Sequence, residues 1–311
     1  MKQAGSSLYT LKKRMTKIIG YWELYLFILP ALAYIIIFSY IPMYGIQIAF
    51  KNYNPALGYS DSPWVGFTHF INFFKSFYFW RLISNTFAIS IYSTIVGFPI
   101  PIIFALMLNE VRMAKFKKIT QTIMYAPHFI SMVVMVGIIN MMLSPSIGVI
   151  NKLIEFVGGT PQYFMVLPSA FRHVYVWSGI WQGLGWSAII YLAALSAVDP
   201  ELHEAATIDG ASKLQRIIHI NIPTILPTII ILLIMSFGSL ASVGYEKVYL
   251  MRNDLNVEVS EVIATYVYER GLKKGQFSYS SAIDIFNNVV NVCMLLIANF
   301  IASKTTETSL F

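Results

Sequence analysis

The chain has 311 residues, of which 57% are hydrophobic and only 12% are charged, and its formal net charge is +7. Soluble domains carry about 25% charged residues, so this composition indicates an integral membrane protein and excludes a soluble globular one. The basic residues fall between apolar runs, which indicates orientation in a membrane rather than binding to nucleic acid. The single cysteine, Cys293, lies in an apolar run, where we expect it to be a small buried hydrophobe.

A basic N-terminal segment precedes the first apolar run, residues 24–46; its basic residues are Lys12, Lys13, Arg14 and Lys17. A basic stretch before an apolar one can mark a signal peptide. This apolar run is, however, long enough to cross about 30 Å of hydrocarbon. We therefore expect an uncleaved first transmembrane helix.

Five further apolar runs predict the remaining spans, at about residues 85–108, 122–143, 174–198, 225–243 and 282–302. Six spans place both termini on the same side of the membrane. The N-terminal segment and the loop after the second span are the most basic, so the positive-inside rule places both termini in the cytoplasm. Prolines within the second span, Pro99 and Pro101, predict a kink there.

The polar segment 244–278 then lies outside the cell, and an amphipathic helix is expected within it at about residues 259–272. Helical spacing predicts that one face turns toward the bundle and the other toward water. The first face carries Ile263, Tyr266 and Val267, and the second carries Glu261, Arg270 and Lys273.

Residues 199–223 form the one long polar stretch between two clearly apolar runs. Asp199 followed by Pro200 is a helix-start signal, because the carboxylate can cap the helix and proline at the first position loses no hydrogen bond. Small side chains on either side of Gly210 would let another backbone come close. We expect two short helices with a bend at Gly210, ended by Pro223; an ordinary interfacial helix is the alternative interpretation.

Three short motifs stand in this stretch: Glu204-Ala205-Ala206, Asp209-Gly210-Ala211 and Ile220-Asn221-Ile222-Pro223. Together they resemble the EAA signature of binding-protein-dependent ABC importer permeases. Ile217 and Ile222 depart from the family pattern, which has Phe and Leu there, but both keep the apolar character. The stretches IPMYGIQIAFKNYNP, NEVR, YAPHF and SEVIATYVYERGL extend the resemblance over residues 25–303, and within the family to its LplB-like branch for complex saccharides.

The resemblance implies an all-α integral membrane protein with the type I importer permease (MetI-like) fold, in a bacterial plasma membrane. It also implies a second homologous permease, two copies of an ATPase subunit and an extracytoplasmic solute-binding protein as partners. The chain itself would bind no cofactor, with ATP and Mg²⁺ held by the ATPase. The residues expected to contact that ATPase are Glu204, Ala205, Ala206, Asp209, Gly210 and Ala211.

The spans hold uncharged polar and aromatic side chains rather than ionisable ones; these are Asn140, Gln182, Trp186, Tyr191, Asn287, Asn288 and Asn291. Amides hydrogen-bond to hydroxyl groups and aromatic faces stack on sugar rings, so this set predicts a path for an oligosaccharide. Hydrogen bonding between helices would also account for each residue singly. The scarcity of Lys and Arg in the spans favours a neutral substrate over a polyanion, although basic residues in loops, such as Arg172, could still contact an anionic one. Asp284 lies near a span's end, where a solvated or capping carboxylate is expected.

Two other classes remain as alternatives. An ion-coupled secondary transporter would place charges at the midplane, and a membrane-embedded glycosyl-transfer enzyme would carry paired carboxylates or metal ligands. The sequence shows neither, and it has no P-loop for nucleotide phosphates. The expected organisation is a cytoplasmic basic segment (1–23), a permease domain (24–304) holding the coupling helices (199–223) and the outer loop (244–278), and a short tail (305–311).

Overall fold

The computed structural model describes residues 20–306 and 308–310, so the basic cluster at Lys12–Lys17 lies outside the described residues. Contacts divide the chain into two compact units at Gly66 and Phe67, and each is described by itself. The described residues form helices with no β-strand; Lys51 and Trp64 make an isolated bridge. An almost entirely helical chain follows from the long apolar runs, because a helix satisfies its backbone polar groups within one segment.

The first unit consists of one long helix and a short loop region. Its elements are α2 (Trp22–Ile35), η1 (Ile36–Tyr40), α3 (Ile41–Met43), η2 (Tyr44–Phe50) and α4 (Gly58–Asp61). The first four run together as Trp22–Phe50, which is 29 residues long and covers the predicted first span. In the loop, the Lys51 ammonium lies 5.0 Å from the centroid of the Trp64 ring and donates to the Tyr59 carbonyl.

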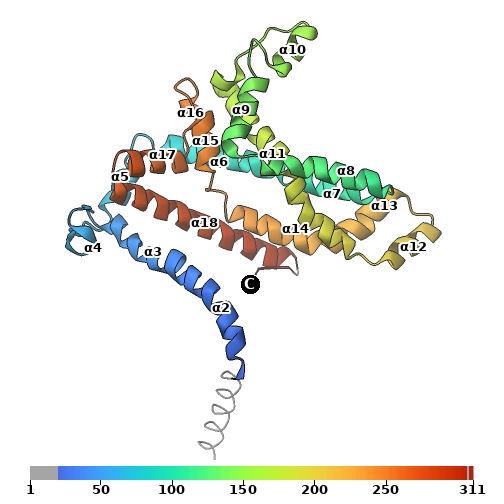
Figure 1. The fold of residues 1–311 in the computed structure, drawn as a ribbon, viewed down its shortest axis with the longest axis horizontal. Helices are drawn as coiled ribbons and strands as arrows, with labels where there is room; N and C mark the ends of the chain where they lie inside the picture. The colour runs from blue at the N-terminus through green and yellow to red at the C-terminus, as the bar shows by residue number, and fades with distance from the viewer. Residues whose placement is uncertain (1–19, 307, 311) are drawn as a thin grey trace, which may run out of the picture. The chain divides into compact units, whose positions relative to one another are not determined.

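The second unit holds all the other helices that the structure describes. Its elements are α5 (Thr68–Phe74), α6 (Phe79–Gly97), α7 (Pro99–Asn109), α8 (Ala114–Tyr125), η3 (Ala126–Phe129), α9 (Met132–Met142), α10 (Val149–Phe156), η4 (Phe164–Val166), α11 (Pro168–Ser196), α12 (Pro200–Ile208), α13 (Lys213–Arg216), η5 (Ile217–Asn221), α14 (Ile222–Phe237), α15 (Tyr245–Met251), α16 (Val257–Ser260), α17 (Ile263–Tyr268), η6 (Glu269–Lys273) and α18 (Phe277–Thr305). Figure 1 shows α12 and α13 at one end of this unit and α5 and α17 at the opposite end.

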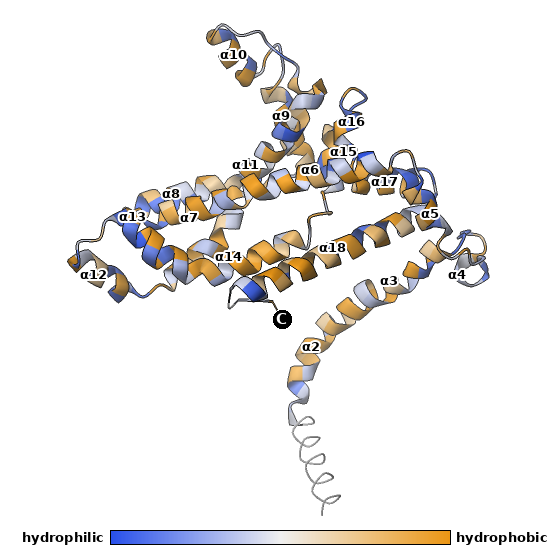
Figure 2. Cartoon of the chain, turned by 180° about the vertical axis from the view of Figure 1, so that it is seen from behind, coloured by the Kyte–Doolittle hydropathy of each residue, from blue (hydrophilic) through white to orange (hydrophobic). Residues whose placement is uncertain are grey.

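Four helices among the described residues are long and apolar enough to cross a membrane: Trp22–Phe50, Phe79–Asn109, Lys213–Phe237 and Phe277–Thr305. Two further pairs of helices, each bent by more than 40° at a short break, meet the same test if each pair is counted as one span. The number of candidate spans among the described residues is then six. Figure 2 shows the hydrophobic colouring along α14 and α18, with hydrophilic residues gathered at α13. Most apolar runs of the sequence therefore coincide with long helices, and the run at residues 122–143 is the exception.

The prediction of a single helix over residues 122–143 is wrong at its centre. The helix breaks between η3 and α9, whose arms meet at 104°. Pro127 at the start of η3 disfavours a continued helix, and Ile130 and Ser131 take extended backbone angles. Ser131 then caps α9, because its hydroxyl accepts from the Val134 N–H at 3.4 Å.

The prediction that Pro223 ends a short helix is also wrong. Residues 213–237 form one continuous helix, so the second coupling helix runs directly into the fifth predicted span. The preceding turn, η5, is a π-helix, in which the Ile222 N–H donates to the Ile217 carbonyl five residues back. This wider turn leaves room for the Pro223 ring, which would clash in a regular α-helix.

The long helix α11 lies at the centre of the packing. One cluster of buried side chains joins it to α9 and α15, including Met135, Phe171 and Val248. A second joins it to α7 and α14, including Ala105 and Ile225. Because four surrounding elements pack against α11, residues along this helix can both stabilise the fold and border any path between its neighbours.

The outer-loop helix differs from the prediction in two respects. The predicted helix at about residues 259–272 is interrupted, because Glu261 and Val262 take extended backbone between α16 and α17. Glu261 is also buried rather than in water. Its carboxylate pairs with Arg81 of α6, and with Arg252 at 3.8 Å. Arg252 in turn pairs with Glu269. A buried carboxylate needs such partners, because an unpaired charge in a desolvated site is strongly unfavourable. The predicted burial of Ile263 and Tyr266 is confirmed. The expected burial of Cys293 is wrong, because this residue is exposed on α18.

A close backbone approach fixes α11 against α8. A methyl group built at Gly185 would lie 2.2 Å from the Met124 carbonyl oxygen, whereas one at Gly183 meets nothing within 4 Å. We therefore expect Gly185→Ala to destabilise the protein by about 1–3 kcal/mol, since α11 and α8 would have to separate. The control Gly183→Ala should be neutral or stabilising, because alanine favours the helix.

Thermal unfolding of the detergent-solubilised importer, followed by size-exclusion chromatography, measures both variants. A lower midpoint for Gly185→Ala with an unchanged midpoint for Gly183→Ala is the expected result. Equal midpoints for the two variants would contradict the close approach.

Candidate functional site

The coupling stretch, residues 199–223, contains two capped helix starts and a glycine between them. The Asp199 carboxylate accepts from the Glu201 N–H at 3.0 Å and so caps α12, as predicted from the sequence. Gly210 has a φ of +78°, a backbone conformation that L-residues with side chains rarely adopt. Ser212 and Gln215 then form a capping box that starts α13. The predicted bend at Gly210 is confirmed.

A hydrogen bond between side chains links the two helices on either side of the bend. The Arg216 guanidinium donates to the Thr207 hydroxyl at 2.7 Å and so ties α13 back to α12. The Ala211 N–H also donates to the Ala206 carbonyl at 2.8 Å. The angle between the two helices is therefore held by more than the backbone of Gly210. Sequence reasoning missed Arg216, because nothing in the spacing points from it to Thr207.

The surface of this stretch is open to a partner. Glu204, Ala205 and Asp209 are exposed, and Ala206 and Ala211 are half-buried. Within the described part of the chain, Glu204 makes no ion pair. Ile208 beside them is 86% exposed. An unpaired carboxylate next to exposed small and apolar side chains is suited to a protein interface.

Three adjoining cavities follow α11 on the side of α6 and α7. Their volumes are about 370, 210 and 230 Å³. The first shares Ser93 and Tyr175 with the second, and shares Gly97, Pro101 and Ser187 with the third, so the three form one continuous row. Most polar lining side chains are hydroxyls: Ser90, Ser93, Thr94, Ser187, Ser236, Ser239 and Ser242.

Two of the predicted path residues border this row. Gln182 lines the first cavity, and its amide donates to the Ile130 carbonyl at 3.0 Å. Tyr191 lines the third cavity. Asn291 is buried on α18 and does not line a cavity itself. Its amide donates to the hydroxyl of Ser242 at 2.7 Å, and Ser242 lines the second cavity.

The other predicted path residues do not line these cavities. Trp186 is half-exposed and stacks on the His128 ring with centroids 4.4 Å apart. Asn140 and Asn288 are exposed, and Asn287 is buried on α18. The structure therefore does not gather the seven predicted side chains into one site, and their assignment to a path stays a prediction.

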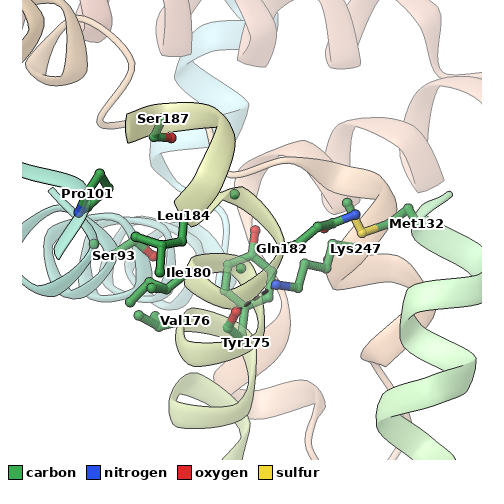
Figure 3. A pocket seen from close by; sticks show the side chains of 13 residues that line it. Ser93, Pro101, Met132, Tyr175, Val176, Ile180, Gln182, Leu184, Ser187 and Lys247 are labelled. Carbon is green, nitrogen blue, oxygen red and sulfur yellow. Dashed lines mark hydrogen bonds between the residues drawn. The ribbon is translucent and has the colours of Figure 1, made fainter. Parts of the chain in front are cut away.

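Lys247 is the polar lining residue that sequence reasoning placed elsewhere. It belongs to α15, in the segment expected outside the membrane, yet it is 6% exposed and lines the first cavity. Its ammonium donates to the Tyr175 carbonyl at 2.7 Å and lies 4.5 Å from the Tyr175 ring centroid (Figure 3). Burial lowers the pKa of Lys247 to about 7. No signal in the sequence separates this buried lysine from its exposed neighbour Glu246.

Comparison with known proteins identifies the class. Residues 97–305 match the family described as the inner membrane component of binding-protein-dependent transport systems. The chain belongs to this family, which is the permease subunit of ABC importers, and it is a multi-pass membrane protein. This membership confirms the resemblance seen in the sequence and decides against the two alternative classes.

Individual relatives support the assignment over nearly the whole chain. The chain is 45% identical over 300 residues to the polygalacturonan/rhamnogalacturonan transport system permease protein YteP of Bacillus subtilis, covering 96% of this chain and 94% of YteP. It is 44% identical to Protein LplB of the same organism, covering 93% and 91% of the two chains. It also matches a chain of a bacterial alginate ABC transporter, solved with an alginate pentasaccharide-bound periplasmic protein, with a TM-score of 0.86 and 40% identity over 95% of this chain and 99% of that one.

Proposed function

We propose that this chain is one permease half of an importer for oligosaccharides. The row of hydroxyl-lined cavities along α11 carries the proposal, because hydroxyl groups can exchange hydrogen bonds with a sugar without holding it as tightly as fixed charges would. The relatives named for polygalacturonan, rhamnogalacturonan and alginate support the same substrate class. The predicted path residues Gln182 and Tyr191 are consistent with this path.

The proposed assembly contains a second homologous permease, two copies of an ATPase that holds ATP and Mg²⁺, and an extracytoplasmic solute-binding protein. The alginate transporter solved with its periplasmic protein supports the last of these partners. The open surface around Glu204 supports the ATPase contact. In this assembly Glu204 pairs with a basic residue of the ATPase, while Ala205 and Ala206 fit into its surface.

The proposed orientation places α12 in the cytoplasm and the loop 244–278 outside. The opposite positions of α12 and α17 in the second unit support it (Figure 1). Both termini then lie in the cytoplasm of a bacterial cell, with residues 1–23 as a basic segment, 24–304 as the permease domain and 305–311 as a short tail.

The proposed mechanism couples the ATPase to the path through the coupling stretch. ATP binding closes the ATPase dimer and displaces α12. The bend at Gly210, closed by Arg216 and Thr207, passes this displacement to α13. Because α13 continues without interruption into α14, the displacement reaches Leu232, which lines the third cavity. The path then changes the side of the membrane to which it opens.

Uptake by the reconstituted importer tests this function. The full complex in proteoliposomes, given ATP inside and a galacturonate oligosaccharide with the binding protein outside, should accumulate the sugar. Vesicles that lack the ATPase, the second permease or the binding protein are the controls and should show background uptake only. Sugar accumulation by this chain alone, or none by the full complex, would contradict the proposal.

A further inference from the structure

The row of cavities contains a single basic side chain. Among the described residues that line the three cavities, Lys247 is the one charged side chain; all the others are polar and uncharged or apolar. Within the part of the chain that the structure describes, Lys247 has no carboxylate within ion-pair distance. A desolvated ammonium without a counter-ion is unfavourable, which is why burial lowers the pKa of Lys247. A carboxylate bound beside it would raise that pKa again and hold the side chain in its charged form.

The side chain is held in place rather than free to swing into solvent. Its ammonium uses one of three donors on the Tyr175 carbonyl and lies over the ring of the same residue. Gly179, one helical turn further along α11, leaves the space that the ammonium occupies: a methyl group built there would lie 3.1 Å from Nζ. Figure 3 shows the side chain directed along the cavity wall toward Tyr175, with Gln182 and Met132 beside it.

The remaining donors of the ammonium define what it can bind. A neutral sugar offers hydroxyl oxygens, which leave the positive charge without a partner. A carboxylate offers both acceptor atoms and the opposite charge, and charge-assisted hydrogen bonds are roughly twice as strong as neutral ones. Elsewhere the same cavity presents hydroxyls from Ser93 and Ser187, which suit the other oxygens of a sugar. The cavity volume of about 370 Å³ is within the usual range of small-molecule sites.

We propose that Lys247 binds the carboxylate of a uronic-acid unit in the translocation path, so that this importer carries acidic oligosaccharides in preference to neutral ones. This inference rests on the proposed oligosaccharide import and adds to it the charge of the substrate and the residue that recognises it. It also reverses the preference for a neutral substrate that the scarcity of basic residues in the spans suggested, because the relevant lysine comes from outside the spans.

A pair of substrates that differ only in charge tests the inference. The probes are a galacturonate trisaccharide and its fully methyl-esterified, neutral form, offered to the complete importer in proteoliposomes. Lys247→Gln removes the charge and keeps a donor for the Tyr175 carbonyl, and Lys247→Arg keeps the charge. Lys152→Gln, on the exposed surface of α10, is the matched control for losing one positive charge elsewhere.

Lys247→Gln should lower uptake of the acidic trisaccharide roughly 10- to 100-fold, the range expected for a hydrogen bond to a charged group. Uptake of the methyl ester should stay within about twofold of wild type, because a neutral sugar gains little from the ammonium. Lys247→Arg should keep most of the acidic uptake, and Lys152→Gln should keep all of it.

Three results would overturn the role of Lys247. An equal loss of both probes in Lys247→Gln would mean that the residue only holds α15 against α11. Unchanged uptake of both would mean that the charge is not used. Preferential uptake of the ester by wild type would exclude an acidic substrate while leaving sugar import intact. Uptake of neither probe by wild type would instead refute the proposed function itself.

Discussion

Gly210→Pro should abolish ATP-driven uptake while the chain remains inserted in the membrane. Proline fixes φ near −65°, whereas Gly210 has a φ of +78°. The change also removes the N–H that donates to the Thr207 carbonyl at 3.1 Å. Proline further disfavours the backbone of the preceding Asp209, which has a φ of −72° and a ψ of 1°, because it favours extended angles there. The bend would have to rearrange. We expect uptake below about 1% of wild type, since a conflict of ~3 kcal/mol corresponds to more than a hundredfold.

The control for this prediction is Gly210→Asn. Asparagine tolerates the left-handed region, and a Cβ atom at this position would meet nothing within 4 Å. It should retain most of the uptake. The measurement is uptake per unit of importer in proteoliposomes, with the amount of membrane-inserted chain determined by immunoblot. Normal uptake by Gly210→Pro would show that the geometry of the bend does not matter for coupling.

Glu204→Lys should release the ATPase from the permease. Glu204 is exposed at the coupling surface and has no ion pair of its own among the described residues, so the charge is free to pair across an interface. Reversing the charge at position 204 would replace an attraction to a basic group of the ATPase with a repulsion. Removing one partner of such a pair costs about 2–5 kcal/mol, so the affinity should fall at least about 30-fold.

Co-purification in detergent measures this effect. The ATPase should be retained by wild type and by Asp254→Lys, which makes the same charge change on the exposed outer loop, and should be lost from Glu204→Lys. Glu204→Gln should lie between them, because it removes the attraction without adding a repulsion. If Glu204→Lys retained the ATPase as wild type does, the docking contact would have to be elsewhere.

Local patterns predicted much of the fold. Long apolar runs identified the spans, because the hydrocarbon thickness sets the length of a helix that crosses it. The Asp199-Pro200 cap and the Gly210 bend were also predictable, since each depends on a few neighbouring residues. The break at Ile130 had a local signal as well, in Pro127 and Ser131, but hydropathy concealed it by continuing through the break.

Features that depend on distant partners could not be predicted in this way. Glu261 appeared to be a water-facing residue of an amphipathic helix, and its burial becomes understandable only through Arg81, which lies 180 residues away in the chain. The same holds for Lys247, whose hydrogen-bond partner is the Tyr175 carbonyl of α11. A hydropathy pattern predicts that such charged residues face water, because it contains no information about the tertiary contacts that stabilise them when buried.

The broken third span has a consequence for how the protein is made. Its second arm, α9, has 11 residues and is therefore about 16 Å long, roughly half the hydrocarbon core. At the break, the Ile130 carbonyl accepts a hydrogen bond from the Gln182 amide of α11, which forms the fourth predicted span. A span with a free carbonyl at its bend is poorly suited to lipid on its own. We therefore expect the third and fourth spans to leave the insertion machinery together, so that the order of biosynthesis protects the break until α11 has covered it.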